Sequence, residues 1–296
     1  MSAKASGCEV NEDLARERSK CNFDVLEVTN IIDGGKEKTE ERKKIGFSLY
    51  YKDRIPEACL SMAERYENAV RKSCLYTVMV KEKVLELNGM ETLGSPFLRR
   101  TSDAYFREIS PFLLHLGMFV PTIIGQASPE QQAYWLPKAL DLQIVGAYAQ
   151  TELGHGTFIR GLETTATYDP ETEEFILHSP TLTSYKWWAG GVGKTANHCI
   201  VLAQMITKGK CHGIHPFIVQ IRDLDTHMPL PGIKVGELGP RMGYNTADNG
   251  FLAFNHHRIP RQNLLMKNFQ VEKVIILLKI NYELLKNIFE GAWPDG

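Results

Sequence analysis

Residues 148–160, YAQTELGHGTFIR, leave a predicted strand and enter a glycine-rich polar loop. Before them, residues 14–142 lack strand-like alternation and place charged and apolar side chains at helical spacing, as at Met62 and Tyr66. From about Ile144 onward, short apolar runs are separated by turn residues, which is typical of a sheet. Because helices precede strands instead of alternating with them, the sequence predicts an α+β protein with segregated parts and not a doubly wound sheet.

Turn and cap residues predict where several elements begin and end. Gly34-Gly35 ends a helix, whereas Asn88-Gly89 and Gly94-Ser95-Pro96 mark loops. Ser128 followed by Pro129 and by Gln131 is a helix start, and Pro137 is expected to kink or end that helix. The turn residues 169–172 predict a hairpin between two of the expected strands. Those strands are residues 163–168, 174–178, 199–206, 216–221 and 250–254.

Length and composition exclude several classes of function. The 296 residues, 43% of them hydrophobic, are enough for two packed units. A formal charge of −1 leaves no basic field for nucleic acid, and no apolar segment has the length of a membrane span. The six cysteines form no C-x-x-C pair, and His256-His257 in a strand point to opposite faces. We therefore expect no metal site and no disulfide framework.

Two glycine-containing segments could bind a flat heterocycle, although each also has a purely structural interpretation. Residues 150–157 combine hydroxyl and amide groups with exposed backbone N–H donors. This combination is typical of a ligand-binding loop, but a polar hairpin connection would have the same residues. His155 between two glycines is a tight turn or part of a site. Residues 186–191, KWWAGG, could form a second wall of a site for a planar ring. The alternative is that the two tryptophans are buried in a β core. The run GGVGKT at 190–195 lacks the spacing of a phosphate-binding loop.

Both segments resemble peroxisomal acyl-CoA oxidases, with the straight-chain enzyme closest. The resemblance is carried by YAQTELGHG, KWWAGGVGKTANH, DNGFLAFNHHRIPRQNLLMK and, in the helical part, LHLGMFVPTIIGQASPEQQAYWLP. It implies an N-terminal helical domain (1–143), an antiparallel β-barrel-like middle domain (144–267) and, in the family, long C-terminal helical domains that have no counterpart here. The loop TELGHG differs from the T-E-P-x-A-G-S-D-like loop of acyl-CoA dehydrogenases, which favours the oxidase branch.

The resemblance also implies a cofactor, a substrate and a reaction. Family members use FAD and O2 to oxidise acyl-CoA to trans-2-enoyl-CoA, giving H2O2. The positions that match FAD contacts are Thr151 and Gly190, with Gln150 and Trp187 expected beside them. The family's catalytic glutamate lies beyond the matching region, so no catalytic residue is expected in this chain. Three alternatives stay open: an oxidase family member, a non-catalytic product that binds flavin or a full-length subunit, and a dehydrogenase.

Residues 268–296 depart from the family pattern. Val271, Val274 and Leu278 begin an apolar seam at helical spacing, which predicts a helix that packs on its own domain or on a partner, as in a homodimer or a pairing with a full-length subunit. The family is peroxisomal, whereas the terminal Pro-Asp-Gly is not a peroxisomal address of the Ser-Lys-Leu type.

Overall fold

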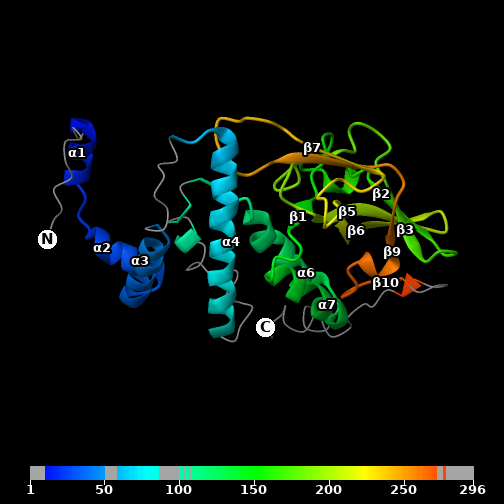
Figure 1. The fold of residues 1–296 in the computed structure, drawn as a ribbon, viewed down its shortest axis with the longest axis horizontal. Coiled ribbons are helices and arrows are strands. Elements are labelled where there is room, and N and C mark those ends of the chain that lie inside the picture. Colours follow the sequence, from blue (N-terminus) through cyan, green and yellow to red (C-terminus); the bar gives the residue numbers. More distant parts are fainter. Residues whose placement is uncertain are drawn as a thin grey trace, which may run out of the picture.

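A computed structural model describes residues 11–50, 59–86, 100–102, 105–106, 108–271 and 276–277. The first half of the chain is helical and lies to one side of a sheet domain (Figure 1). Among the described helices, none has both the length and the apolar character that a bilayer span needs. The helices are α1 (Glu12–Ser19), α2 (Val25–Asp33), α3 (Lys36–Tyr50), α4 (Met62–Glu86), the π-helical turn η3 (His115–Phe119), α6 (Val120–Gln126) and α7 (Pro129–Leu140).

The predicted helix signals act as expected where the structure describes them. Gly34 ends α2 in the left-handed conformation, with φ of 89°. Ser128 and Gln131 form a reciprocal capping box at the start of α7. Pro137 does not end α7, which continues to Leu140. The predicted loops at 88–89 and 94–96 lie outside the described residues.

The strands form two main sheets. A six-stranded sheet has the order β1-β5-β2-β3-β9 with β6 also paired to β5, and a three-stranded sheet has the order β4-β8-β7. The short 3-10 turns η4 (Ile159–Gly161) and η5 (Arg261–Asn263) connect some of them. The strands are β1 (Gly146–Ala149), β2 (Thr165–Asp169), β3 (Glu174–His178), β4 (Lys186–Ala189), β5 (His198–Thr207), β6 (Lys210–Gln220), β7 (Ile233–Glu237), β8 (Gly250–Phe254) and β9 (His257–Pro260).

The α+β class and the β2–β3 hairpin are confirmed, but the sheet is mixed and not purely antiparallel. Both β1 and β2 pair with β5 in parallel, whereas β3, β6 and β9 join through antiparallel pairs. Parallel neighbours need a long crossover, and β1 and β5 are separated by the chain that forms β2, β3 and β4. The predicted border at 143 falls between the end of α7 and the start of β1.

The large sheet separates two cores. Side chains from one face of β5 and β6, such as Val201 and Phe217, are buried in the space enclosed with the second sheet. Side chains from the other face, such as Ile200 and Ile218, pack with Ile123 against α6 and α7. This alternation follows the two-residue period of strands. Helices therefore cover one face of the sheet, next to the loop that leaves β1 (Figure 1).

The predicted C-terminal helix is wrong at the positions that the structure describes. Gln270–Val271 and Ile276–Leu277 form a two-stranded antiparallel pair, β10 and β11, although the apolar seam has helical spacing. Val271 is 1% exposed and belongs to the β core, so tertiary burial decides its conformation. The rest of the predicted helix lies outside the described residues.

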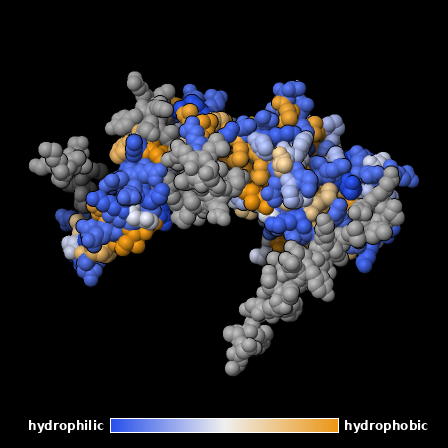
Figure 2. All heavy atoms as spheres, turned by 90° about the horizontal axis from the view of Figure 1, so that it is seen from below, coloured by the Kyte–Doolittle hydropathy of each residue, from blue (hydrophilic) through white to orange (hydrophobic). Residues whose placement is uncertain are grey.

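The N-terminal helices carry apolar side chains on their surface. Val25 and Ile31 of α2 are 70% and 78% exposed, and Phe23 just before it is 54% exposed. Apolar side chains are visible on this end of the molecule in Figure 2. In this chain they face solvent.

Candidate functional site

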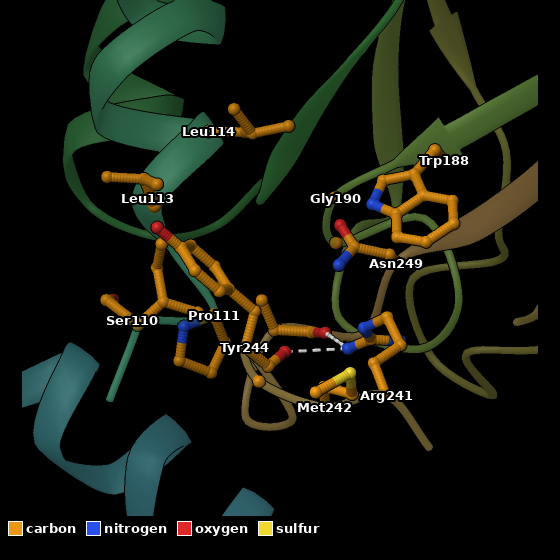
Figure 3. A pocket seen from close by; sticks show the side chains of 14 residues that line it. Ser110, Pro111, Leu113, Leu114, Trp188, Gly190, Arg241, Met242, Tyr244 and Asn249 are labelled. Atoms are coloured by element: carbon orange, nitrogen blue, oxygen red, sulfur yellow. Dashed lines mark hydrogen bonds between the residues drawn. The ribbon is translucent and has the colours of Figure 1, made fainter. Parts of the chain in front are cut away.

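A cavity of about 750 Å³ lies where the helical part meets the second sheet. Its walls come from the turn before η3 on one side and from β4 and the loop before β8 on the other (Figure 3). Most of the lining is apolar or backbone, with few polar groups, as in pockets for organic ligands. The lining residues are Ile109, Ser110, Pro111, Leu113, Leu114, Trp188, Gly190, Gly191, Arg241, Met242, Gly243, Tyr244, Ala247 and Asn249.

Gly190 lies in the wall of this cavity and is itself buried. A Cβ at this position would lie 3.0 Å from Leu114 Cδ1 and 3.2 Å from Asn249 Oδ1, closer than ordinary contact. The glycine therefore lets Leu114 and Asn249 pack closely against the backbone of the wall. Gly190 was expected from the sequence, and the structure places it in the cavity wall.

Trp188, and not the expected Trp187, is the tryptophan that lines the cavity. A register shift between Trp187 and Ala189 interrupts the pairing of β4 with β8, and Trp188 has φ of 64°. Left-handed backbone at a bulky residue costs about 1–3 kcal/mol and concentrates at functional sites. Trp187 instead stacks near Phe251, with ring centroids 6.2 Å apart. Two adjacent tryptophans in a sequence do not predict such a bulge.

Gln150 and Thr151 meet the start of β4 through backbone contacts. The Trp187 N–H donates to Thr151 O at 2.9 Å, and Lys186 Nζ donates to Gln150 O at 3.2 Å. Neither Gln150 nor Thr151 lines the cavity, and Thr151 is exposed. The structure thus brings Gln150, Thr151 and Trp187 together, with Gly190 three residues further along the chain.

The Gly154-His155-Gly156 segment is a tight turn. Glu152 and His155 exchange both backbone hydrogen bonds, at 3.0 and 3.1 Å. His155 Nε2 donates to Glu163 Oε1 at 2.9 Å. Hydroxyl donors from Thr181, together with His155, lower the pKa of the Glu163 carboxyl. These contacts give His155 a structural role beside the loop.

Neither acidic residue near the loop reaches the cavity. The Glu152 side chain is fully buried and its carboxylate is hydrogen-bonded within the fold. Glu163 is engaged by His155 and by the threonines at 181 and 183. Among the described residues that line the cavity, none is Asp or Glu. The described residues of the cavity wall therefore include no carboxylate that could act as a base.

The GGVGKT turn already uses three of its backbone N–H donors, those of Gly193, Lys194 and Thr195, within the fold. Asp248 accepts hydrogen bonds from the Lys194 and Thr195 N–H groups at 2.5 and 2.8 Å. Arg222 donates to three carbonyls of the same turn, at 192, 193 and 196. Tyr66 of α4 contacts the Thr195 hydroxyl at 2.7 Å, and burial, followed by the nearby Asp248 charge, raises the pKa of Tyr66 to about 12. The turn is therefore a rigid support for the cavity wall.

No group of three or more potential metal ligands occurs in the part of the chain that the structure describes. His256 stacks on His178, with ring centroids 4.0 Å apart, while His257 Nδ1 contacts Pro231 O. The adjacent histidines therefore have separate partners.

Residues 24–145 match the family model of the acyl-coenzyme A oxidase N-terminal domain. The human peroxisomal acyl-coenzyme A oxidase 1 is 50% identical over 266 residues, which is 89% of this chain and 39% of that protein. Acyl-coenzyme A oxidase 1 of Drosophila melanogaster is 45% identical over 272 residues, or 88% of this chain and 40% of that protein. The chain thus spans about two-fifths of the length of these curated relatives.

Solved structures agree with these relatives. An acyl-CoA oxidase from tomato has a TM-score of 0.75 and 43% identity, covering 90% of this chain and 40% of that one. Acyl-CoA oxidase-1 of Caenorhabditis elegans, complexed with FAD and ATP, has a TM-score of 0.76 and 42% identity, covering 90% and 41%. Residues 24–145 therefore match the acyl-coenzyme A oxidase N-terminal family model, and the chain as a whole is similar to about two-fifths of the length of peroxisomal acyl-CoA oxidases.

Proposed function

We propose that the chain binds FAD and an acyl-CoA at the cavity between its helices and its second sheet. The reaction served by this site is the oxidation of acyl-CoA to trans-2-enoyl-CoA, with O2 reduced to H2O2, in peroxisomes. The observation that carries the proposal is the cavity itself, whose wall brings Trp188 and Gly190 of the sheet side opposite Leu114 of the helical side. The similarity to acyl-CoA oxidases over 89% of the chain supports it.

The residues around the cavity fit a flat ring and an apolar chain. Trp188 offers an aromatic face on the sheet side, while Leu113 and Leu114 offer an apolar surface opposite (Figure 3). The Asn249 amide can donate to a ring oxygen or nitrogen. The Lys194 and Thr195 N–H groups of the GGVGKT turn are occupied by Asp248, so a pyrophosphate would need other contacts.

The chemistry divides between the cofactor and the protein. Bound FAD would accept the hydride that leaves the β carbon of the acyl group. The apolar wall would exclude water and orient the acyl chain. Removal of the acidic α proton needs a base within reach, and the described cavity walls contain no carboxylate. We therefore expect ligand binding with little turnover by this chain alone, unless a full-length subunit completes the site.

Titration of the purified chain with FAD tests this proposal. Binding should quench flavin fluorescence and give a yellow protein whose visible band shifts when palmitoyl-CoA is added. Peroxide formation with palmitoyl-CoA and O2 is expected to be near background. Ready peroxide formation would show that a base is present, and flavin bleaching with slow reaction toward O2 would favour a dehydrogenase. Failure to bind FAD contradicts the proposal itself.

A further inference from the structure

A fully buried ion pair joins the residues next to Thr151 and Trp187 in the sequence. Lys186 Nζ is 3.0 Å from Glu152 Oε1, and both side chains are 0% exposed. Glu152 follows Thr151, and Lys186 precedes Trp187. Neither charge lines the cavity. Burial of the ammonium lowers the pKa of Lys186, while the Glu152 carboxylate opposes that shift.

Every polar position of this pair is used. Besides Lys186, the Glu152 carboxylate accepts hydrogen bonds from the Glu163 N–H at 2.8 Å and from the Thr164 N–H and hydroxyl at 3.0 and 2.6 Å. Lys186 Nζ also donates to Gln150 O at 3.2 Å and to Leu202 O at 2.6 Å. An ammonium has three N–H donors, and all three have acceptors here.

These partners join the two sheets at one corner. Gln150 follows the end of β1, and Leu202 lies on β5, the strand parallel to β1. Thr164 directly precedes β2 in the same sheet, whereas Lys186 is the first residue of β4 in the other sheet. The ion pair thus sets the distance between the loop that leaves β1 and the strand that leads to Trp188 and Gly190.

Packing alone does not require charges at this place. Apolar residues of similar volume often stabilise a core as well as a buried ion pair, because desolvation offsets the attraction between the charges. A saturated pair can instead specify one geometry, since every hydrogen bond must be satisfied together. The Trp187 N–H donates to Thr151 O at 2.9 Å, so the two segments meet beside the pair.

We propose that Glu152 and Lys186 are positioning residues for FAD: they fix β4, which leads to Trp188 and Gly190 of the cavity wall, against the loop that leaves β1, without touching the ligand. This inference rests on the proposed function. Its consequence is that an apolar replacement of the pair preserves the fold but loosens the flavin site.

The decisive variant is Glu152→Met combined with Lys186→Met in the 296-residue chain. Single substitutions leave one buried charge unpaired and are expected to unfold more easily. In the double variant, far-UV circular dichroism of the FAD-free protein should stay close to wild type, whereas thermal unfolding should occur at a lower temperature because the Glu163 and Thr164 N–H groups lose their acceptor. Its dissociation constant for FAD, from fluorescence quenching, should rise about tenfold or more, and the visible circular dichroism of bound flavin should weaken.

Arg258→Met is the matched control. Arg258 pairs with Asp169 and Glu174, each at 3.0 Å, on the β2–β3 hairpin, and is partly exposed. Removal of this cation should leave FAD affinity unchanged. A folded double Met variant with wild-type affinity and flavin dichroism would overturn the inference. A wild-type chain that binds no FAD would overturn the proposed function first, and the inference with it.

If the double Met variant does not fold, a milder pair of variants tests the positioning role of Glu152 and Lys186. Thr164→Val removes one hydroxyl donor to Glu152, whereas Thr164→Ser keeps it. We expect about threefold weaker FAD binding for the valine variant and wild-type binding for the serine variant. Equal affinity of both variants and wild type would contradict a positioning role.

Discussion

Gly146 shows how one residue fixes the contact between helices and sheet. A Cβ at this position would lie 2.1 Å from Phe119 Cγ, and the Gly146 N–H donates to His115 Nδ1 at 3.0 Å. Gly146→Ala should therefore lower the free energy of unfolding by about 3 kcal/mol or more, measured by urea denaturation. Gly125→Ala, in α6 with nothing within 4 Å, is the control and should be neutral or stabilising. Similar effects of the two substitutions would contradict this packing.

The cavity wall offers a second matched pair of glycines. Gly190→Ala would place a methyl group 3.0 Å from Leu114 Cδ1 and 3.2 Å from Asn249 Oδ1, so these two cavity-lining side chains would have to shift. Gly243 lines the same cavity, but a Cβ there meets nothing within 4 Å. We expect FAD binding about tenfold weaker in Gly190→Ala and nearly unchanged in Gly243→Ala, as measured by fluorescence titration. Unchanged affinity in both would place the flavin elsewhere.

At the scale of single residues, Gly190 was named because it matches a FAD contact of the family that the sequence resembles. The structure shows that Gly190 lines the cavity, and its contact with FAD stays a prediction. Trp188 could not be distinguished from Trp187, because the choice depends on a register shift between β4 and β8. A bulge is set by the partner strand, which lies about 60 residues away in sequence.

At the scale of elements, α7 is joined to the last part of the sheet through one side chain. Gln131 Nε2 donates to Gln262 O and Leu264 O, each at 2.7 Å, and its Oε1 accepts from the Met266 N–H at 2.9 Å. Gln131→Ala should cost about 2–3 kcal/mol of unfolding free energy, because four backbone groups, the Ser128 N–H among them, lose their partner. Ser128→Ala removes the cap acceptor and an exposed hydroxyl donor to Glu130, and should cost about 1 kcal/mol. Chemical denaturation measures both, and equal losses would show that Gln131 acts as a cap alone.

For the whole molecule, buried neutral histidines couple stability to pH. Burial lowers the pKa of His115 to about 4, and burial together with Lys138 lowers that of His198 to about 4. In the unfolded chain a histidine titrates near its ordinary 6.5. Between these values the unfolded state binds more protons, so stability is full above about pH 6.5 and is lost as pH falls toward about 4.

This coupling predicts that the free energy of unfolding falls steeply as the pH is lowered below about 6.5. Two histidines give at most about 2.7 kcal/mol per pH unit, an order-of-magnitude slope. Urea denaturation at about pH 7, 6 and 5 measures it. His198→Gln should reduce the slope by about one proton, and an unchanged slope would contradict the assignment of His198.

The sequence by itself determined the order of helices before strands, the capped start of α7 and the β2–β3 hairpin. These features depend on local propensity, turn chemistry and short motifs, which act over a few residues. The tertiary structure alone decided the parallel pairing of β1 and β2 with β5, the strand conformation at Val271 and the burial of the Glu152–Lys186 pair. Each of these depends on contacts between residues far apart in sequence, where packing and desolvation outweigh local preference.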